Sequence, residues 1–131
     1  MIQITKNFTL EELTRTSKAP SQSPNAQSVV NLVFLCANVL QPIRDLHGAP
    51  IRVNSGFRST LVNQAVGGNP TSQHLTGQAA DITTGNKTSN TLLYNRIKAS
   101  NIPFDQLILE NGGQWLHVSW SRNPRKQSLV L

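Results

Sequence analysis

The strongest local signal in the chain is a β-hairpin close to its C-terminus. Residues Gln106–Glu110 and Trp115–Trp120 have strand composition, and Asn111-Gly112-Gly113 lies between them. Asn and Gly supply the positive φ angles that tight hairpin turns require. We expect a two-residue turn at Asn111-Gly112 or Gly112-Gly113. Such a turn pairs even-numbered residues of the first strand with odd-numbered residues of the second.

A helical apolar repeat from Ser28 to about Leu46 predicts the main core helix, with apolar residues at Val29, Leu32, Val33, Cys36, Val39 and Leu40. We expect Pro42 to kink this helix or to begin a new turn. Upstream, Thr9-Leu10-Glu11-Glu12 has the spacing of a capping box and predicts a short helix. Residues 17–28 are rich in Ser, Pro, Asn and Gln, and they predict a long loop.

The remaining elements complete an α+β pattern. We expect a strand at Ile51–Val53, a short helix at Leu61–Val66, a buried strand at Ala79–Thr83, and a helix that carries Leu92, Leu93 and Ile97 behind a cap at Thr88 or Ser89. This order predicts helices packed against a small, mainly antiparallel sheet. A length of 131 residues allows one domain over 1–131.

Composition narrows the class of protein. With 37% hydrophobic and 14% charged residues, the chain matches a globular domain. The longest apolar run, Leu32–Ala37, is far shorter than the roughly 18 residues of a membrane span, so we expect none. Met1–Lys6 lacks the pattern of a secretory signal. We therefore expect synthesis in the cytoplasm and, for any action outside it, release by another route.

The net charge of +6 predicts attraction to polyanions, which include nucleic acid, anionic lipid and cell-wall polymers. Aromatic residues make up only 5% of the chain, too few for an obvious base-stacking surface. Most basic residues are scattered, apart from Arg122, Arg125 and Lys126. We therefore expect no nucleic-acid partner.

Few residues are available for metal chemistry. The lone Cys36 excludes an internal disulfide and a multi-cysteine zinc site. His47 ends the core helix, where a cation suits the helix dipole. His74, Asp81 and His117 are two imidazoles and a carboxylate, a set that suits Zn²⁺ and leaves one position open for water. From spacing alone, two ordinary histidines and a solvated Asp81 explain the pattern equally well.

Several ordered motifs resemble one known family. They are Ser55-Gly56-Phe57-Arg58-Ser59, Val66-Gly67-Gly68, Ser72-Gln73-His74, Gly77-Gln78-Ala79-Ala80-Asp81-Ile82 and Trp115-Leu116-His117-Val118-Ser119. In this order they resemble the zinc D-Ala-D-Ala carboxypeptidase family, whose fold is shared with lysostaphin-type peptidases and the hedgehog signalling domain. The segment 8–14 also resembles small phage and bacterial members, so the resemblance spans nearly the whole chain.

The resemblance implies a function and a set of site residues. It implies zinc held by His74, Asp81 and His117, with Arg58 and Ser72 in contact with the substrate. The implied reaction is hydrolysis of a peptide bond in the peptidoglycan stem peptide, with a zinc-bound water as nucleophile. Without the resemblance, Arg58 is a surface charge and Ser72 a turn hydroxyl.

The chain departs from the family at the general base. Many members carry an acidic residue three positions before the last histidine, where this chain has Gln114, which cannot accept the proton. The hairpin parity places Glu110 on the same face as His117 and Asp105 on the opposite face. Glu110 is therefore our candidate base, and its alternative is a solvated residue beside a turn.

The preferred interpretation is a monomeric zinc peptidase that acts at the bacterial cell wall, for example a phage lysis enzyme (endolysin). The bond cut stays open among the terminal D-Ala-D-Ala bond, a cross-bridge and a bond within the stem. The alternatives are a catalytically silent zinc-binding module that binds cell wall or a protein partner, and a basic nucleic-acid-binding domain.

Overall fold

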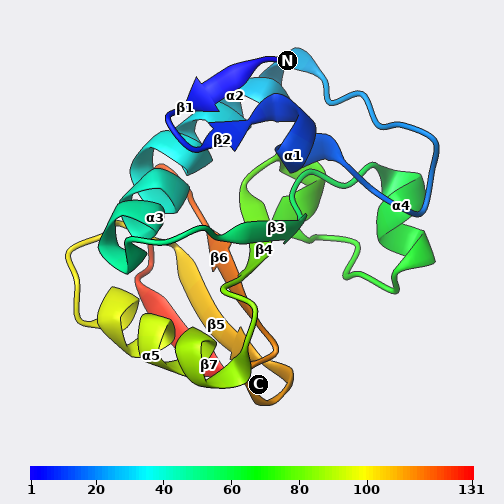
Figure 1. Cartoon of the computed structure of the whole chain (residues 1–131). Coiled ribbons are helices and arrows are strands. Elements are labelled where there is room, and N and C mark those ends of the chain that lie inside the picture. The colour runs from blue at the N-terminus through cyan, green and yellow to red at the C-terminus, as the bar shows by residue number, and fades with distance from the viewer.

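A five-stranded mixed sheet lies at the centre of the computed structural model, which describes residues 1–131 (Figure 1). In spatial order its strands are β3 (Arg52–Ser55), β4 (Ala79–Thr83), β6 (Trp115–Ser119), β5 (Gln106–Glu110) and β7 (Gln127–Val130). The first four pair antiparallel, and β7 pairs with β5 in parallel. The predicted α+β class is confirmed. The predicted small, mainly antiparallel sheet is wrong in detail, because the sheet has five strands and is mixed.

The parallel edge strand β7 explains this difference. It pairs through the register Leu107↔Ser128 and Ile108↔Leu129, along the free edge of β5. A parallel pair cannot be closed by a hairpin, so no turn signal announces it. A second, two-stranded sheet of β1 (Gln3–Thr5) and β2 (Phe8–Thr9) also lacked a sequence signal.

The turn between β5 and β6 is longer than predicted. Glu110 pairs with Trp115, so four residues connect the strands, three of them in the 3₁₀ turn η3 (Asn111–Gly113). Asn111 and Gly112 take the left-handed conformation, with φ angles of 52° and 67°. Two-residue and four-residue connections preserve the same parity. The predicted pairing of even with odd residues is therefore confirmed.

The main core helix is continuous from Ala26 to His47. It comprises α2 (Ala26–Leu35), the π-helical turn η1 (Cys36–Leu40) and α3 (Gln41–His47). Pro42 has no N–H to donate to the preceding turn, and the π-helical turn ends at Leu40, two residues before it. The irregularity predicted at Pro42 takes this form.

Four further helical segments complete the fold. They are α1 (Leu10–Thr14), α4 (Thr60–Ala65), the 3₁₀ turn η2 (Gln73–Thr76) and α5 (Lys87–Lys98). The predicted capping box at α1 is present, with Thr9 and Glu12 bonded reciprocally. The cap of α5 is Asn86, not Thr88 or Ser89. Its side chain accepts from the Ser89 N–H at 2.7 Å, and an extended asparagine is among the strongest N-caps.

The helices α2, α3 and α5 cover one face of the sheet (Figure 1). Alternate strand residues enter the same hydrophobic cluster as these helices, among them Ala80, Ile82, Leu107, Leu109, Leu116 and Val118. Because side chains alternate along a strand, the residues between them lie on the opposite face. Asp81 and His117 therefore lie on the face away from the helices.

The segment Ala26–His47 is also long and apolar enough, by length and composition, to count as a candidate membrane span of 22 residues. The run Leu32–Ala37 did not predict this, because polar residues interrupt the longer apolar stretch. The core helix of a globular protein passes the same test. Here Leu32, Leu35, Val39 and Ile43 are fully buried in the hydrophobic core.

Candidate metal centre

The sheet register places Asp81 opposite His117. The two residues are direct partners in the antiparallel pair of β4 and β6. Opposed residues on one face lie close enough for their side chains to meet. Nδ1 of His117 lies 3.0 Å from Oδ1 of Asp81, and both side chains are largely buried.

His74 reaches the same carboxylate from η2. The Ser72 hydroxyl accepts from the His74 N–H at the start of this turn, and Gly77 ends it at a φ of +74°. A Cβ on Gly77 would lie 2.4 Å from the carbonyl oxygen of Ser28, so only glycine allows this approach to α2.

One hydrogen bond sets the tautomer of His74. Its Nδ1 lies 2.6 Å from the carbonyl oxygen of Gly56, which can only accept, so Nδ1 carries the proton. In the neutral ring Nε2 then presents a lone pair. This atom lies 3.4 Å from Oδ1 of Asp81, which also presents lone pairs. A cation between the two atoms, either a proton or a metal ion, is needed to make this contact favourable.

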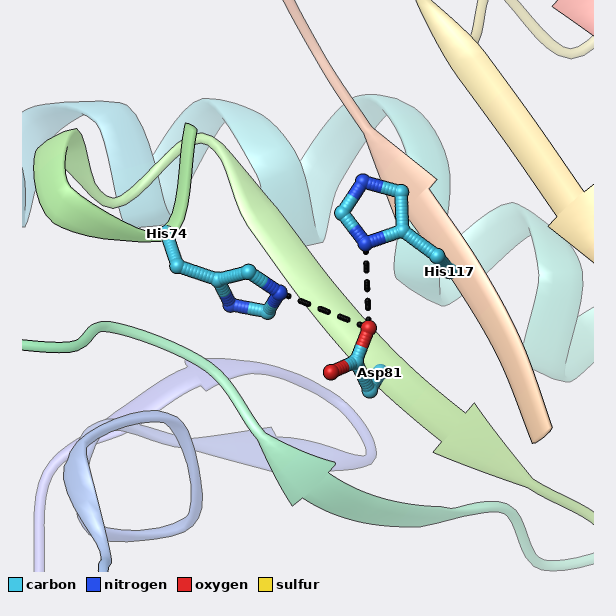
Figure 2. A group of neighbouring side chains, drawn as sticks. All are labelled: His74, Asp81 and His117. Carbon is cyan, nitrogen blue, oxygen red and sulfur yellow. Dashed lines mark hydrogen bonds and ion pairs between the residues drawn. The ribbon is translucent and has the colours of Figure 1, made fainter. Parts of the chain in front are cut away.

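The three side chains fit a metal ion (Figure 2). One ligand atom from each of His74, Asp81 and His117 lies within 4.8 Å of the others. Ligands at about 2.0–2.1 Å from a tetrahedral Zn²⁺ are separated by about 3.4 Å. The separation of His74 Nε2 and Asp81 Oδ1 equals this value. Two imidazoles and one carboxylate also leave a fourth position free, as catalytic zinc sites do.

The carboxyl group of Asp81 is in the ionised form that a metal ligand needs. Burial alone raises the pKa of its carboxyl group, but the hydrogen bonds and charges of His117 and His74 outweigh burial and lower that pKa below its usual range. The carboxylate is therefore ionised at neutral pH, the form in which it binds metal.

Arg58 is hydrogen-bonded to Asp81, one of the three proposed metal ligands. Its guanidinium donates to Oδ2 of Asp81 at 3.0 Å, to Oγ of Ser55 at 3.0 Å and to Oδ1 of Asn63 at 3.4 Å. Its side chain is only 15% exposed. Arg58 thus holds the carboxylate oxygen that neither histidine faces.

Ser72 lines a polar cleft beside the group, together with His117. Its hydroxyl also caps η2, so a structural role and a contact with a ligand are both available to it. The register puts Glu110 and His117 on one face, since Ile108 lies opposite His117 and Glu110 opposite Trp115. Glu110 is a diagonal neighbour of His117, about 7–8 Å away by ordinary sheet geometry. It is not one of the three grouped ligands.

Cys36 and His47, which the sequence analysis did not assign to the metal site, are not among the three grouped ligands. Cys36 is buried in the core, and burial raises the pKa of its thiol to about 12, so it stays protonated. His47 lies in the last turn of α3, as predicted.

The sequence reasoning missed the surroundings of Asp105. This buried carboxylate precedes β5 and accepts hydrogen bonds from Arg125 and Gln73. Gln73, Gln106 and Arg125 line the same cleft as His117. The only available signal was the position of Gln73 immediately before His74.

The chain matches known proteins over most of its length. The sequence pattern of the family described as Peptidase M15 matches residues 6–119. The chain belongs to the peptidase M15 family. It is also 36% identical, over 88 residues and 62% of its length, to a zinc D-Ala-D-Ala carboxypeptidase of Streptomyces albus G. The matched region covers 32% of that relative, so the chain spans about a third of its length.

Membership of this peptidase M15 family, together with the relative named above, implies Zn²⁺ as the cofactor. The donor set of His74, Asp81 and His117 fits that ion in number, chemistry and spacing. The resemblance stated from the sequence motifs is thereby confirmed.

Proposed function

We propose that this chain is a zinc metallopeptidase that hydrolyses a peptide bond in the stem peptide of bacterial peptidoglycan, as a carboxypeptidase or an endopeptidase. The observation that carries the proposal is the convergence of His74, Asp81 and His117 on one point, on the sheet face away from the core. Membership of the peptidase M15 family and the similarity to a zinc carboxypeptidase support it.

In this proposal His74, Asp81 and His117 hold the metal. When bound, Zn²⁺ supplies a Lewis acid that polarises the scissile carbonyl and makes a coordinated water more acidic. The Gly56 carbonyl fixes the ring of His74, and Arg58 fixes the carboxylate of Asp81. Partners of this kind orient metal ligands before the ion arrives.

Glu110 is the proposed general base. It shares a face with His117 at the end of β5, and a carboxylate can accept the proton of the attacking water and pass it to the leaving amine. Gln114, which occupies the position of the usual family acid, contacts the turn instead, since its Oε1 accepts from Asn111 Nδ2 at 3.1 Å.

Ser72 and Arg58 are proposed substrate contacts of different kinds. Ser72 lines the cleft that also contains His117, so its hydroxyl can meet the substrate backbone there. Arg58 uses three of its five N–H donors on Asp81, Ser55 and Asn63. Its two remaining donors are available to the scissile carbonyl, next to the ligand that it holds.

We place the action at the cell wall, as in phage lysis, because the net charge of +6 favours an anionic polymer. The test is digestion of purified peptidoglycan by the zinc-loaded chain, with the released peptides identified by mass spectrometry. We expect new peptides whose masses identify the bond. Binding to peptidoglycan without any released peptide would instead favour a catalytically silent zinc-binding module.

A further inference from the structure

A cleft lies beside the proposed metal ligands His74, Asp81 and His117, and Arg125 is the only residue in its lining that is always charged. Its volume is about 440 Å³, and no hydrophobic residue lines it. The lining consists of Asn69, Thr71, Ser72, Gln73, Gln106, His117 and Arg125. A polar cleft with one cation suits a polar ligand that carries an anionic group.

The guanidinium of Arg125 is held in a fixed orientation. Its Nε donates to Oδ1 of Asp105 at 3.0 Å and one terminal nitrogen donates to Oδ2 at 2.7 Å, which forms a bidentate pair. The backbone N–H of Arg125 donates to the same carboxylate at 2.9 Å. Asp105 is buried, whereas the Arg125 side chain is 55% exposed. The buried carboxylate of Asp105 therefore holds the guanidinium of Arg125 in place, while the guanidinium itself faces the cleft.

The ion pair with Asp105 leaves several N–H donors of the Arg125 guanidinium without a partner. A guanidinium has five N–H donors, and Asp105 takes two of them from one edge. Three donors remain, including those on the edge between the two terminal nitrogens. That edge matches the two oxygens of a second carboxylate.

Asp105 is hydrogen-bonded to η2, the turn that carries the proposed metal ligand His74. Gln73 Nε2 donates to Oδ2 of Asp105 at 3.0 Å, and Gln73 immediately precedes His74. Hydrogen bonds thus link the guanidinium of Arg125 through Asp105 to Gln73, and Gln73 is bonded directly to the proposed ligand His74 along the backbone. Such a link sets the position of a substrate anion relative to the reacting bond, which is how orientation contributes to rate.

Arg58 is less suited to this task. Three of its donors are already used within the protein, and its side chain is 15% exposed. It does not line the cleft.

We propose that Arg125 is a specificity-determining residue that binds a carboxylate of the substrate in this cleft, with Asp105 and Gln73 as its positioning residues. The inference rests on the proposed peptidase function and deepens it. The carboxylate comes either from the C-terminus of the stem peptide or from a free carboxylate within the stem. Both sources share one chemistry, and amidation of each in turn distinguishes them.

The test compares stem peptides that differ only in one group, a carboxylate or its carboxamide, at the C-terminus or within the stem. Zinc-loaded wild type, Arg125→Gln and the control Arg122→Gln are assayed with each pair. We expect Arg125→Gln to lower kcat/KM by roughly 10-fold or more on the acid, mainly through KM, since a charge-assisted bond is lost. On the amide whose acid form Arg125 binds, the loss should be less than about 3-fold. Arg122→Gln should match wild type on all peptides.

Arg125→Lys keeps the charge but loses the fork, and we expect it to recover only part of the preference for the acid. Zinc content and melting temperature of each variant separate misfolding from loss of recognition. An equal loss on every acid and amide overturns the inference, because the effect is then not a contact with a carboxylate. If wild type cleaves no peptide, the proposed function fails. Calorimetric binding of the same peptides then decides whether Arg125 still prefers the acid.

Discussion

The Arg58 guanidinium donates to Oδ2 of Asp81, while His74 and His117 both face Oδ1 of the same carboxylate. The two oxygens of one side chain thus have separate roles. Oδ2 is fixed by a cation from the protein, and Oδ1 is directed towards the point where the three ligands meet (Figure 2). The orientation of Asp81 therefore depends on Arg58.

Removal of Arg58 should weaken metal binding. We expect Arg58→Ala to lower the affinity for Zn²⁺ by about 10–100-fold, the usual effect of losing a partner that orients a ligand. A competition titration against a chelator measures this affinity. Arg122→Ala provides the matched control and should bind as wild type. Equal affinities in the two variants would contradict a role for Arg58 in holding Asp81.

Replacement of the ligands themselves should have a larger effect. One zinc ion should bind per chain, and Ala at His74, Asp81 or His117 should each reduce the zinc content because the site loses one of three protein donors. Elemental analysis of purified protein measures this content. Cys36→Ser should bind zinc normally, since the thiol is buried away from the group. Full occupancy in all three ligand variants would sink the assignment.

Local patterns predicted the two strands that carry Asp81 and His117, but not the 3₁₀ turn η2 that carries His74. The strands at Ala79–Thr83 and Gln106–Glu110 were predicted with their bounds, and the parity of the hairpin was right although its turn was longer. The strand β7 could not be predicted. It joins the sheet as a parallel edge strand without a hairpin, and its segment of four residues has no alternation of buried and exposed positions.

The motifs singled out His74, Asp81 and His117, but not the interactions around them. The pairs Arg58–Asp81 and Arg125–Asp105 join residues 23 and 20 positions apart. Nothing in the local pattern of either arginine specifies its partner. Charge pairing over such separations depends on how the strands and loops pack, so it appears only in the folded chain.

Asp105 makes the stability of the fold depend on pH. The hydrogen bonds and charge of Arg125, with a smaller contribution from Gln73, lower the pKa of its carboxyl group from 3.8 to about 2. A carboxyl group whose pKa is lower in the folded state stabilises the protein above its unfolded pKa, and this contribution is lost as the pH falls towards the folded value. Wild type should therefore lose stability between about pH 4 and pH 2.

Circular dichroism melts across this range test the dependence on Asp105. Asp105→Asn should be less stable than wild type at neutral pH, because the ion pair is absent, and the difference should shrink as the pH approaches 2. Arg125→Gln removes the cation that lowers the pKa, so it should show the same convergence. Parallel curves for wild type and both variants would contradict this account.

The proposed general base gives the sharpest test, because it depends on strand parity as well as family membership. Glu110→Gln keeps the size and hydrogen-bonding length of the side chain but removes the basic oxygen. Zinc content should stay at the wild-type level, since Glu110 is not among the three ligands. If Glu110 accepts the proton of the attacking water, kcat should fall by roughly 100-fold or more. Asp45→Asn, on α3, is the matched control and should keep wild-type turnover.

The position of the usual family acid supplies a second arm of the same test. Gln114→Glu, introduced into the Glu110→Gln variant, should restore part of the lost turnover if a carboxylate at either position can reach the attacking water. Steady-state kinetics of both variants on a stem peptide that still contains the bond identified by digestion measure this recovery, with zinc content checked in parallel. The assignment fails if Glu110→Gln retains wild-type kcat with zinc bound. In that case the proton is accepted elsewhere, and Glu110 is the solvated residue beside a turn that its place at the end of β5 also allows.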